Sequence, residues 1–232
     1  MRRWAPVWKT PREERQAQRR RRTPMPKINV IDTEGRWDKN NEDEFLWWPR
    51  TLWIDPGVTS GVAVVWFDPR ALLVDNARTP KVLLAYSELF LHGPENGVGG
   101  QIHRFLRLRA KLDEEIGLAT GCEGFIPLQL NQDRDFLSPV RIRAGIDYEL
   151  AKTKPLGASE IGHGVPLNIQ MPVDAKAAFN NNRLQALRMY TEGPDHINDA
   201  KRHCLLHIRR LKAQGGLERF KEMHGYEKGW FE

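Results

Sequence analysis

Three apolar runs that follow one another between residues 50 and 90 restrict the possible folds more than any other part of the sequence. The runs are TLWID, GVAVVWFD and KVLLAYSELF, and all three contain the β-branched and aromatic residues that are common in strands. The short segment PGVTS separates the first two runs, and residues 69–80 form a turn region before the third. We therefore predict three consecutive strands that pair as a meander.

The rest of the chain alternates predicted helices with two short predicted strands. Apolar residues near positions 101–117 follow a period of about 3.6 residues, which is typical of an amphipathic helix. Further helices are predicted near residues 139–151, 182–191 and 196–213, and short strands at GCEGFIP and LNIQMP. Because these helices can cover the faces of the sheet, we predict a mixed α/β layer fold.

The positive charge of the protein is concentrated at its N-terminus. Residues 1–27 contain ten Lys or Arg and two Glu, a net charge of +8, so the total of +6 leaves −2 for the other residues. The densest part is Arg19, Arg20, Arg21 and Arg22, and such an arm can bind nucleic-acid phosphates of any sequence. A solvated tail or a localisation signal is the alternative.

Three regions are assigned from this distribution. They are a basic, largely irregular extension (1–50), a core (51–215) and a C-terminal tail (216–232). The five tryptophans of the extension are expected to pack onto the core or to stack on bases.

The composition disfavours several other classes of protein. Cys122 and Cys204 are the only cysteines and lack CxxC spacing, which argues against a zinc site or a disulfide framework and fits a reducing cytoplasm. No stretch approaches the roughly 20 apolar residues that span a bilayer. The start MRRWAPVWKTPREERQ has no apolar signal segment. We expect a cytoplasmic protein without a membrane partner.

Two acidic side chains occupy unusual places in the predicted strands. Asp55 ends the first strand in IDPGVTSG, where Gly57 and Gly61 permit a tight turn and a close approach of backbone or substrate. Glu123 lies between small residues in TGCEGFIP, and burying a carboxylate is costly without a cation or hydrogen bonds. Metal coordination would explain Glu123, and Asp55 would point outward at the edge of the sheet. The alternatives are a carboxylate that caps the Asp-Pro-Gly turn and a glutamate that faces water.

The segment DHINDAKRH opens the last predicted helix. His196 and Asp199 are three residues apart, so they share a helix face. Asp195 is four residues before Asp199, although an acidic residue at a helix start also stabilises the free N–H groups there. His203, one turn beyond Asp199, either joins the same site or packs in the core.

Together these segments resemble the RuvC family of Holliday-junction resolvases, from about residue 52 to residue 211. Asp55, Glu123, His196 and Asp199 match the four metal-site positions of that family in order and spacing. The resemblance implies an RNase H-like fold, with a five-stranded mixed sheet of three antiparallel and two parallel strands flanked by helices. It also implies that the four residues are catalytic and hold two divalent ions, Mg²⁺ or Mn²⁺.

A second match lies in MPVDAKAAFNNNRLQALRMY. Pro172, Lys176 and Arg183 occupy places where the family has a proline after its last strand and then two basic residues that contact DNA phosphates. The extension and an irregular insertion at residues 127–139, which contains Asp133 and Asp135, depart from the family. These departures resemble the divergent resolvases of bacteriophages, which implies a viral origin and action in the cytoplasm of a bacterial host.

The resemblance implies a crossover junction endodeoxyribonuclease of DNA recombination and repair. It further implies a homodimer that places two sites on opposite strands of a four-way DNA junction, and the helix near residues 101–117 is a candidate dimer surface. Three alternatives stay open. They are a nuclease acting on other branched DNA, flaps or RNA–DNA hybrids, a catalytically inactive nucleic-acid-binding protein, and an ATP-binding fold whose phosphate loop resembles DPGVTSG.

Overall fold

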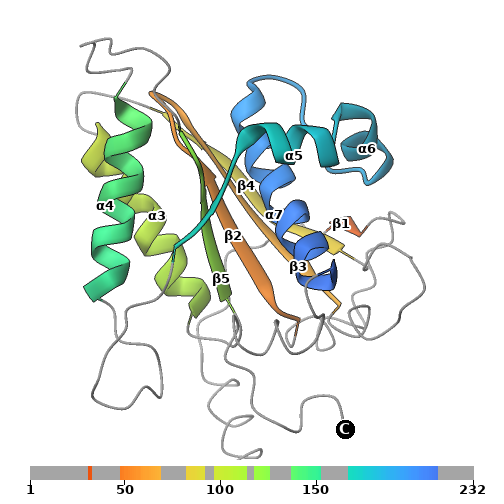
Figure 1. The fold of residues 1–232 in the computed structure, drawn as a ribbon, viewed down its shortest axis with the longest axis horizontal. Coiled ribbons are helices and arrows are strands. Elements are labelled where there is room, and N and C mark those ends of the chain that lie inside the picture. The colour runs from red at the N-terminus through yellow and green to blue at the C-terminus, as the bar shows by residue number, and fades with distance from the viewer. Residues whose placement is uncertain are drawn as a thin grey trace, which may run out of the picture.

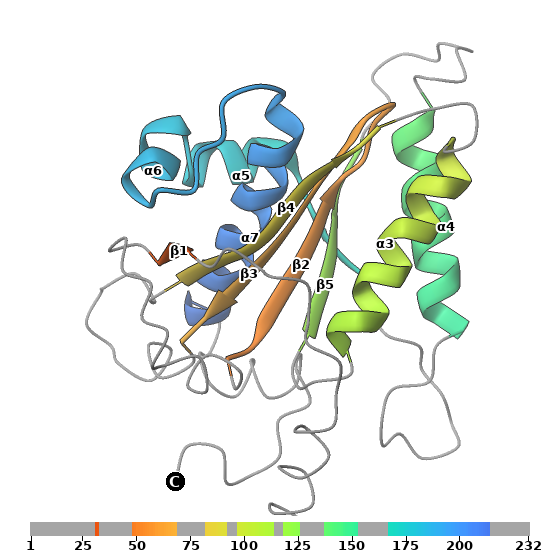
Figure 2. The same cartoon turned by 180° about the vertical axis from the view of Figure 1, so that it is seen from behind.

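The computed structural model describes residues 31–32, 48–68, 82–91, 97–113, 118–125, 137–152 and 167–213. The strands are β1 (Ile31–Asp32), β2 (Arg50–Asp55), β3 (Ser60–Phe67), β4 (Val82–Phe90), β5 (Leu118–Glu123) and β6 (Asn168–Gln170). The helices are α3 (Val98–Asp113), α4 (Ser138–Lys152), α5 (Pro172–Ala178), α6 (Asn181–Ala186) and α7 (Asp195–Ala213). One sheet separates α3 and α4 from α5, α6 and α7 (Figures 1 and 2).

The strand order is β1-β4-β3-β2-β5-β6. β2, β3 and β4 pair antiparallel, which confirms the predicted meander. β5 joins β2 in parallel, and β6 joins β5 in parallel. Three antiparallel and two parallel strands between helices form an RNase H-like core, as the sequence led us to expect. The two-residue strand β1, at the edge beside β4, is an addition from the extension, in which little regular structure was predicted.

The alternation of side chains along β2 decides which face of the sheet carries Asp55. Leu52 and Ile54 point toward α3 and α4, where they join a buried cluster that includes Phe105. Trp53 points to the opposite face and joins the cluster under α7. Because successive strand residues face opposite sides, Asp55 lies on the same side as Trp53 and faces α7.

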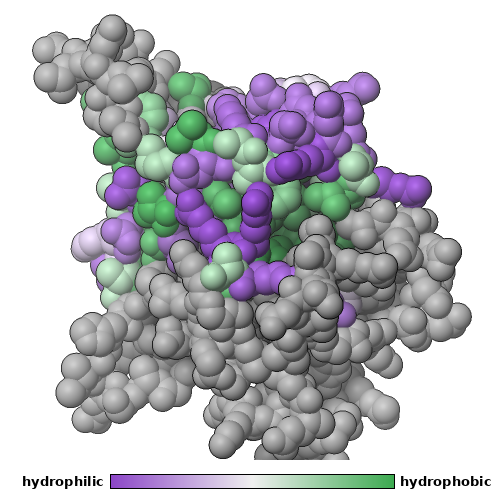
Figure 3. Space-filling model, turned by 45° about the vertical axis from the view of Figure 1, so that its right-hand side comes forward, coloured by the Kyte–Doolittle hydropathy of each residue, from purple (hydrophilic) through white to green (hydrophobic). Residues whose placement is uncertain are grey.

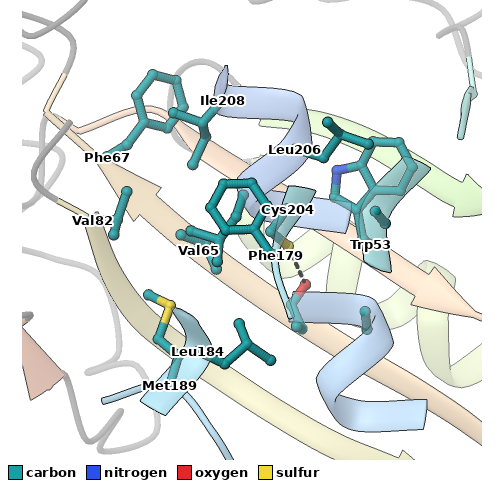
Figure 4. Close-up of a cluster of buried hydrophobic side chains, with 14 of the residues drawn as sticks. Trp53, Val65, Phe67, Val82, Phe179, Leu184, Met189, Cys204, Leu206 and Ile208 are labelled. Carbon is teal, nitrogen blue, oxygen red and sulfur yellow. Dashed lines mark hydrogen bonds between the residues drawn. The ribbon is translucent and has the colours of Figure 1, made fainter. Parts of the chain in front are cut away.

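The cluster under α7 fixes that helix to the sheet (Figure 4). Trp53 and Val65 from the sheet pack with Leu206 of α7, and all three are buried. The thiol of Cys204 donates a hydrogen bond to the Ala63 carbonyl at 3.5 Å. Burial of a large apolar side chain contributes about 1.5–3 kcal/mol, so several such contacts hold α7 in one place relative to β2 and β3.

The structure differs from the prediction at two helices after the last strand. Helix α5 was not predicted. It begins at Pro172, whose missing N–H costs nothing at the first helical position. The helix predicted at residues 182–191 is α6, which is shorter. It begins at Asn181 because the Asn180 side chain accepts a hydrogen bond from the backbone N–H of Arg183 at 3.0 Å and caps the start. Its end comes before Arg188, which has a positive φ of 53°.

Strand β5 begins earlier than predicted and ends at Glu123. GCEGFIP placed Glu123 inside a strand, whereas the structure makes it the last strand residue. The parallel ladder with β2 pairs Arg50 with Leu118 and so sets the start of β5. Helix α3 likewise begins at Val98, three residues before the predicted start. Trp48 is buried in the cluster beside α3 and α4, which confirms packing onto the core for this tryptophan.

Several predictions concern residues outside the described ranges. These are the arm with Arg19, Arg20, Arg21 and Arg22, the insertion with Asp133 and Asp135, and the C-terminal tail. Among the residues that are described, no helix combines the length and the apolar character needed to cross a membrane.

Candidate metal centre

Three carboxylates converge where β2, β5 and α7 meet. Asp55, Glu123 and Asp199 each offer an oxygen, and these oxygens lie within 4.8 Å of one another. Ile54 of β2 pairs with Cys122 of β5, and Asp55 and Glu123 are the next residues along these two strands. They therefore end neighbouring parallel strands at the same edge of the sheet. Helix α7 brings Asp199 over that edge. The structure therefore unites three of the four residues predicted to hold a metal.

The turn after Asp55 is tied to α3 by a buried polar network. The backbone N–H of Gly57 donates to Ser60 Oγ at 3.2 Å, and the Ser60 hydroxyl donates to Gln101 Oε1. The Gln101 amide in turn donates to the Val58 carbonyl at 2.9 Å. Gln101 and Ser60 are both fully buried. This network, which was not predicted, restricts the backbone that positions Asp55.

Gly61 lets α7 approach the sheet closely. A Cβ atom at this position would lie 2.0 Å from the backbone carbonyl oxygen of His196. Only a glycine accommodates that contact without a shift of the helix. The predicted close approach at Gly61 is thus made by the backbone of α7.

His196, the fourth predicted residue, contacts the cluster through Asp55. Its Nδ1 lies 2.7 Å from Asp55 Oδ2, and 42% of its side chain is exposed. The hydrogen bond with Asp55 raises the pKa of His196, against the opposing effect of partial burial. His196 is therefore positioned both to orient Asp55 and to exchange a proton with groups outside the protein.

The environment of Asp55 disfavours its negative charge. Burial raises the pKa of Asp55 to about 6, although the hydrogen bond from His196 acts in the opposite direction. The nearby charges of Glu123 and Asp199 raise it further. A cation between the three carboxylates would stabilise all of them in the ionised form.

Asp199 is held by two basic side chains. Arg202 donates to Oδ1 from Nη1, and Lys176 Nζ lies 3.2 Å from Oδ2. The same guanidinium donates from Nε to the Phe179 carbonyl at 2.9 Å and from Nη2 to Asn181 Oδ1. Arg202 thus links Asp199 to the junction of α5 and α6. It was not predicted, although its position three residues after Asp199 on one helix was a usable signal.

Replacement of Arg202 by Met is expected to lower the free energy of unfolding by about 2–3 kcal/mol. Breaking a buried ion pair costs about 3–5 kcal/mol because it leaves a charge uncompensated, and here Lys176 still offsets part of the charge on Asp199. The measurement is urea denaturation. Arg210→Met is the matched control. Arg210 lies on α7, as Arg202 does, and pairs with the exposed Asp174 of α5, and exposed pairs contribute at most about 1 kcal/mol. Equal losses in the two variants would contradict the assignment.

Glu123 forms a hydrogen bond with His203. The Nε2 atom of His203 lies 2.7 Å from Glu123 Oε2, and its Nδ1 lies 3.1 Å from Gln170 Oε1. Of the two predictions for His203, the structure supports contact with the site, although the ring is also stacked on Trp53 in the core. Gln170 was not predicted, because nothing near it in the sequence indicates which strand it would join.

The predicted phosphate contacts lie on α5 and α6, whose exposed side chains are largely hydrophilic (Figure 3). Lys176 is at the site through its ion pair with Asp199. Arg183 is exposed and donates to the Ala178 carbonyl, so it also links the end of α5 to α6. Contact of either residue with DNA stays a prediction.

The donor set fits a hard divalent cation. Carboxylate oxygens are the preferred ligands of Mg²⁺ and Mn²⁺, and three of them lie within 4.8 Å of one another here. Asp55 and Asp199 are buried and Glu123 is partly exposed, which leaves the cluster open on one side. Residues able to hold a metal are therefore Asp55, Glu123 and Asp199, with His196 beside them.

Comparison with known proteins finds similar solved structures, among them two of RuvC. No protein-family profile and no curated protein sequence matches the chain. RuvC of Thermus thermophilus is 16% identical, with a TM-score of 0.49, over 72% of this chain and 97% of that chain. The T. thermophilus protein in complex with a Holliday junction substrate is 19% identical, with a TM-score of 0.46, over 73% and 97%. At these values neither likeness carries an argument about this chain, whose chemistry follows from its own residues.

Proposed function

We propose that the chain is a metal-dependent endonuclease that resolves Holliday junctions by paired phosphodiester hydrolysis. The observation that carries this proposal is the convergence of Asp55, Glu123 and Asp199, within 4.8 Å, at one edge of an RNase H-like sheet. Hydrogen bonds and ion pairs alone do not explain such a cluster, because the burial of Asp55 opposes its negative charge. Lys176, an exposed basic residue beside Asp199, is consistent with an anionic substrate.

The proposed cofactor is a pair of Mg²⁺ or Mn²⁺ ions. When bound, two such ions would activate a water molecule and neutralise charge on the phosphate and the leaving oxygen. Asp55, Glu123 and Asp199 would hold these ions, because their carboxylate oxygens lie within 4.8 Å of one another. His196 completes the site as a fourth ligand or as the group that moves a proton, and its half-exposed ring suits either role.

Substrate binding is assigned to Lys176, Arg183 and the basic arm. Lys176 reaches the cluster from α5, and its side chain is 56% exposed. In the proposal it contacts the phosphate next to the cleaved bond, together with Arg183. The arm around Arg19, Arg20, Arg21 and Arg22 adds contacts to phosphates of any sequence. Branched DNA is then selected by shape and backbone contacts.

Two sites per assembly are needed for paired cleavage. We therefore propose a homodimer, with one site for each of two opposed strands of the junction. A bacteriophage origin, and hence action in a bacterial cytoplasm, belongs to the same proposal and is supported by the arm and the insertion as departures from the family pattern.

The test is cleavage of a labelled synthetic four-way junction, compared with linear duplex, a flap and an RNA–DNA hybrid, with Mg²⁺ or with EDTA. We expect paired, symmetric nicks in the junction that require the metal. Faster metal-dependent cleavage of a flap or a hybrid would keep the metal site and reject the junction as substrate. Binding of the junction without cleavage of any substrate would instead identify an inactive nucleic-acid-binding protein.

A further inference from the structure

We propose that His203 and Gln170 are positioning residues that hold Glu123 ready to bind a metal ion. The inference rests on the proposed metal site and assigns a role to two side chains that the cleavage chemistry does not itself require. His203 bonds Glu123 with one ring nitrogen at 2.7 Å and Gln170 with the other at 3.1 Å. The three side chains come from α7, β5 and β6.

The strand register places the two outer members of this network side by side. Glu123 and Gln170 are partners in the parallel ladder of β5 and β6, and the backbone of Gly124 donates to the Gln170 carbonyl at 2.7 Å. Their side chains therefore leave the sheet at neighbouring points. The ring of His203, which comes from α7, forms hydrogen bonds with both Glu123 and Gln170.

The chemistry of the partners fixes the direction of the first hydrogen bond. A carboxylate that binds a metal ion only accepts hydrogen bonds, so a partner of Glu123 in that role must donate, and His203 Nε2 is placed to do so. The Gln170 amide offers both an acceptor and a donor, and so it satisfies Nδ1 whether or not that nitrogen is protonated. With both nitrogens engaged, His203 is kept as a hydrogen-bond donor to a metal ligand and is not itself a ligand.

Packing prevents the ring of His203 from turning. Its side chain is fully buried and stacks on Trp53, with ring centroids 5.4 Å apart and planes inclined by 14°. Trp53 in turn lies on Gly121, where a Cβ atom would be 2.4 Å from the indole ring. The glycine therefore leaves room for Trp53, and the stacking on Trp53 holds the imidazole in contact with Glu123.

The consequence for metal binding is preorganisation. Glu123 has several rotatable bonds, and fixing them costs free energy that reduces the affinity of an unrestrained ligand. In this chain the restraint is present before an ion arrives. Partners of this kind, which bond a ligand and not the metal, commonly change metal affinity by about 10–100-fold.

The test is the affinity of the full chain for Mn²⁺ alone, measured by calorimetry without DNA. His203→Leu keeps an apolar side chain against Trp53 and removes the donor, and we expect its Kd to rise about 10–100-fold. His203→Gln places an amide N–H where Nε2 stood and is expected to recover most of the lost affinity. Recovery by Gln is a result that a packing role would not produce.

His207→Leu is the matched control. His207 is a buried histidine one turn later on α7, and its ring lies 5.9 Å from the same Trp53 ring at an angle of 49°. It is expected to bind Mn²⁺ as the unaltered chain does. An equal loss of affinity in His203→Leu and His207→Leu would show that packing around Trp53 is responsible and would overturn the proposal.

Gln170→Leu keeps the proposal testable if His203→Leu does not fold. It removes the second partner of the ring without changing α7, and we expect weaker Mn²⁺ binding. Unchanged affinity in this variant, or in a folded His203→Leu, would overturn the positioning role while leaving the metal site intact. If the unaltered chain binds no Mn²⁺, the metal site itself is wrong and this inference fails with it.

Discussion

Asp55→Asn is expected to reduce cleavage of the junction by at least about a thousandfold while junction binding in Ca²⁺ is retained. The substitution removes one negative charge from the carboxylate that faces both Glu123 and Asp199. A bound divalent ion contributes several kcal/mol to charge stabilisation in hydrolysis, and a loss of about 4 kcal/mol corresponds to about a thousandfold in rate. Because Asn has nearly the same shape, the packing around β2 should be unaffected. Single-turnover cleavage and a gel-shift titration measure the two properties.

Asp174→Asn is the matched control for this prediction. It makes the same chemical change on the exposed surface of α5, where Asp174 pairs with Arg210 at 2.7 Å. Cleavage at the normal rate is expected there. If a pure sample of Asp55→Asn still cleaves the junction at the normal rate, Asp55 is not part of the reaction and the proposed site is rejected.

The part of the site that the sequence predicted is the part set by local patterns. Asp55 ends an apolar strand just before a turn, and His196 and Asp199 share a helix face, so each position follows from the period of its own element. The meander was predictable for the same reason, because its three strands are consecutive and separated by clear turn signals. These residues meet as expected once the sheet forms.

The contacts that were missed depend on elements distant in the sequence. Gln170 reaches His203 only because β6 pairs with β5, and Gln101 reaches Ser60 only because α3 packs beside the turn. Arg202 was overlooked because a basic residue on a helix is usually solvated, whereas the guanidinium is buried by the junction of α5 and α6. Helix α5 was itself unpredicted, so its effect on Arg202 could not be foreseen.

Gly61→Ala is expected to lower the free energy of unfolding by about 3 kcal/mol and to reduce cleavage by about a hundredfold or more. The added Cβ would lie 2.0 Å from the His196 carbonyl oxygen and 2.5 Å from the Ile197 backbone nitrogen. Overpacking usually costs about 1–3 kcal/mol, and the upper end applies because the contact is with backbone, which cannot rotate away. The start of α7 must therefore move, and it carries His196 and Asp199. A misplacement of about 1 Å in a catalytic site can cost about a hundredfold in rate.

Gly99→Ala separates this steric effect from a general effect of replacing glycine. Gly99 lies in α3, and a Cβ there would meet no atom of the described residues within 4 Å beyond its chain neighbours and the backbone of its own helix. Since Ala favours a helix over Gly by up to about 1 kcal/mol, this control should be as stable as the unaltered chain or more stable, with normal cleavage. Urea denaturation and single-turnover cleavage of both variants decide the matter. A Gly61→Ala protein with unchanged stability and cleavage would mean that α7 does not approach β3 as closely as described, and the positions of His196 and Asp199 over the carboxylates of β2 and β5 would have to be revised.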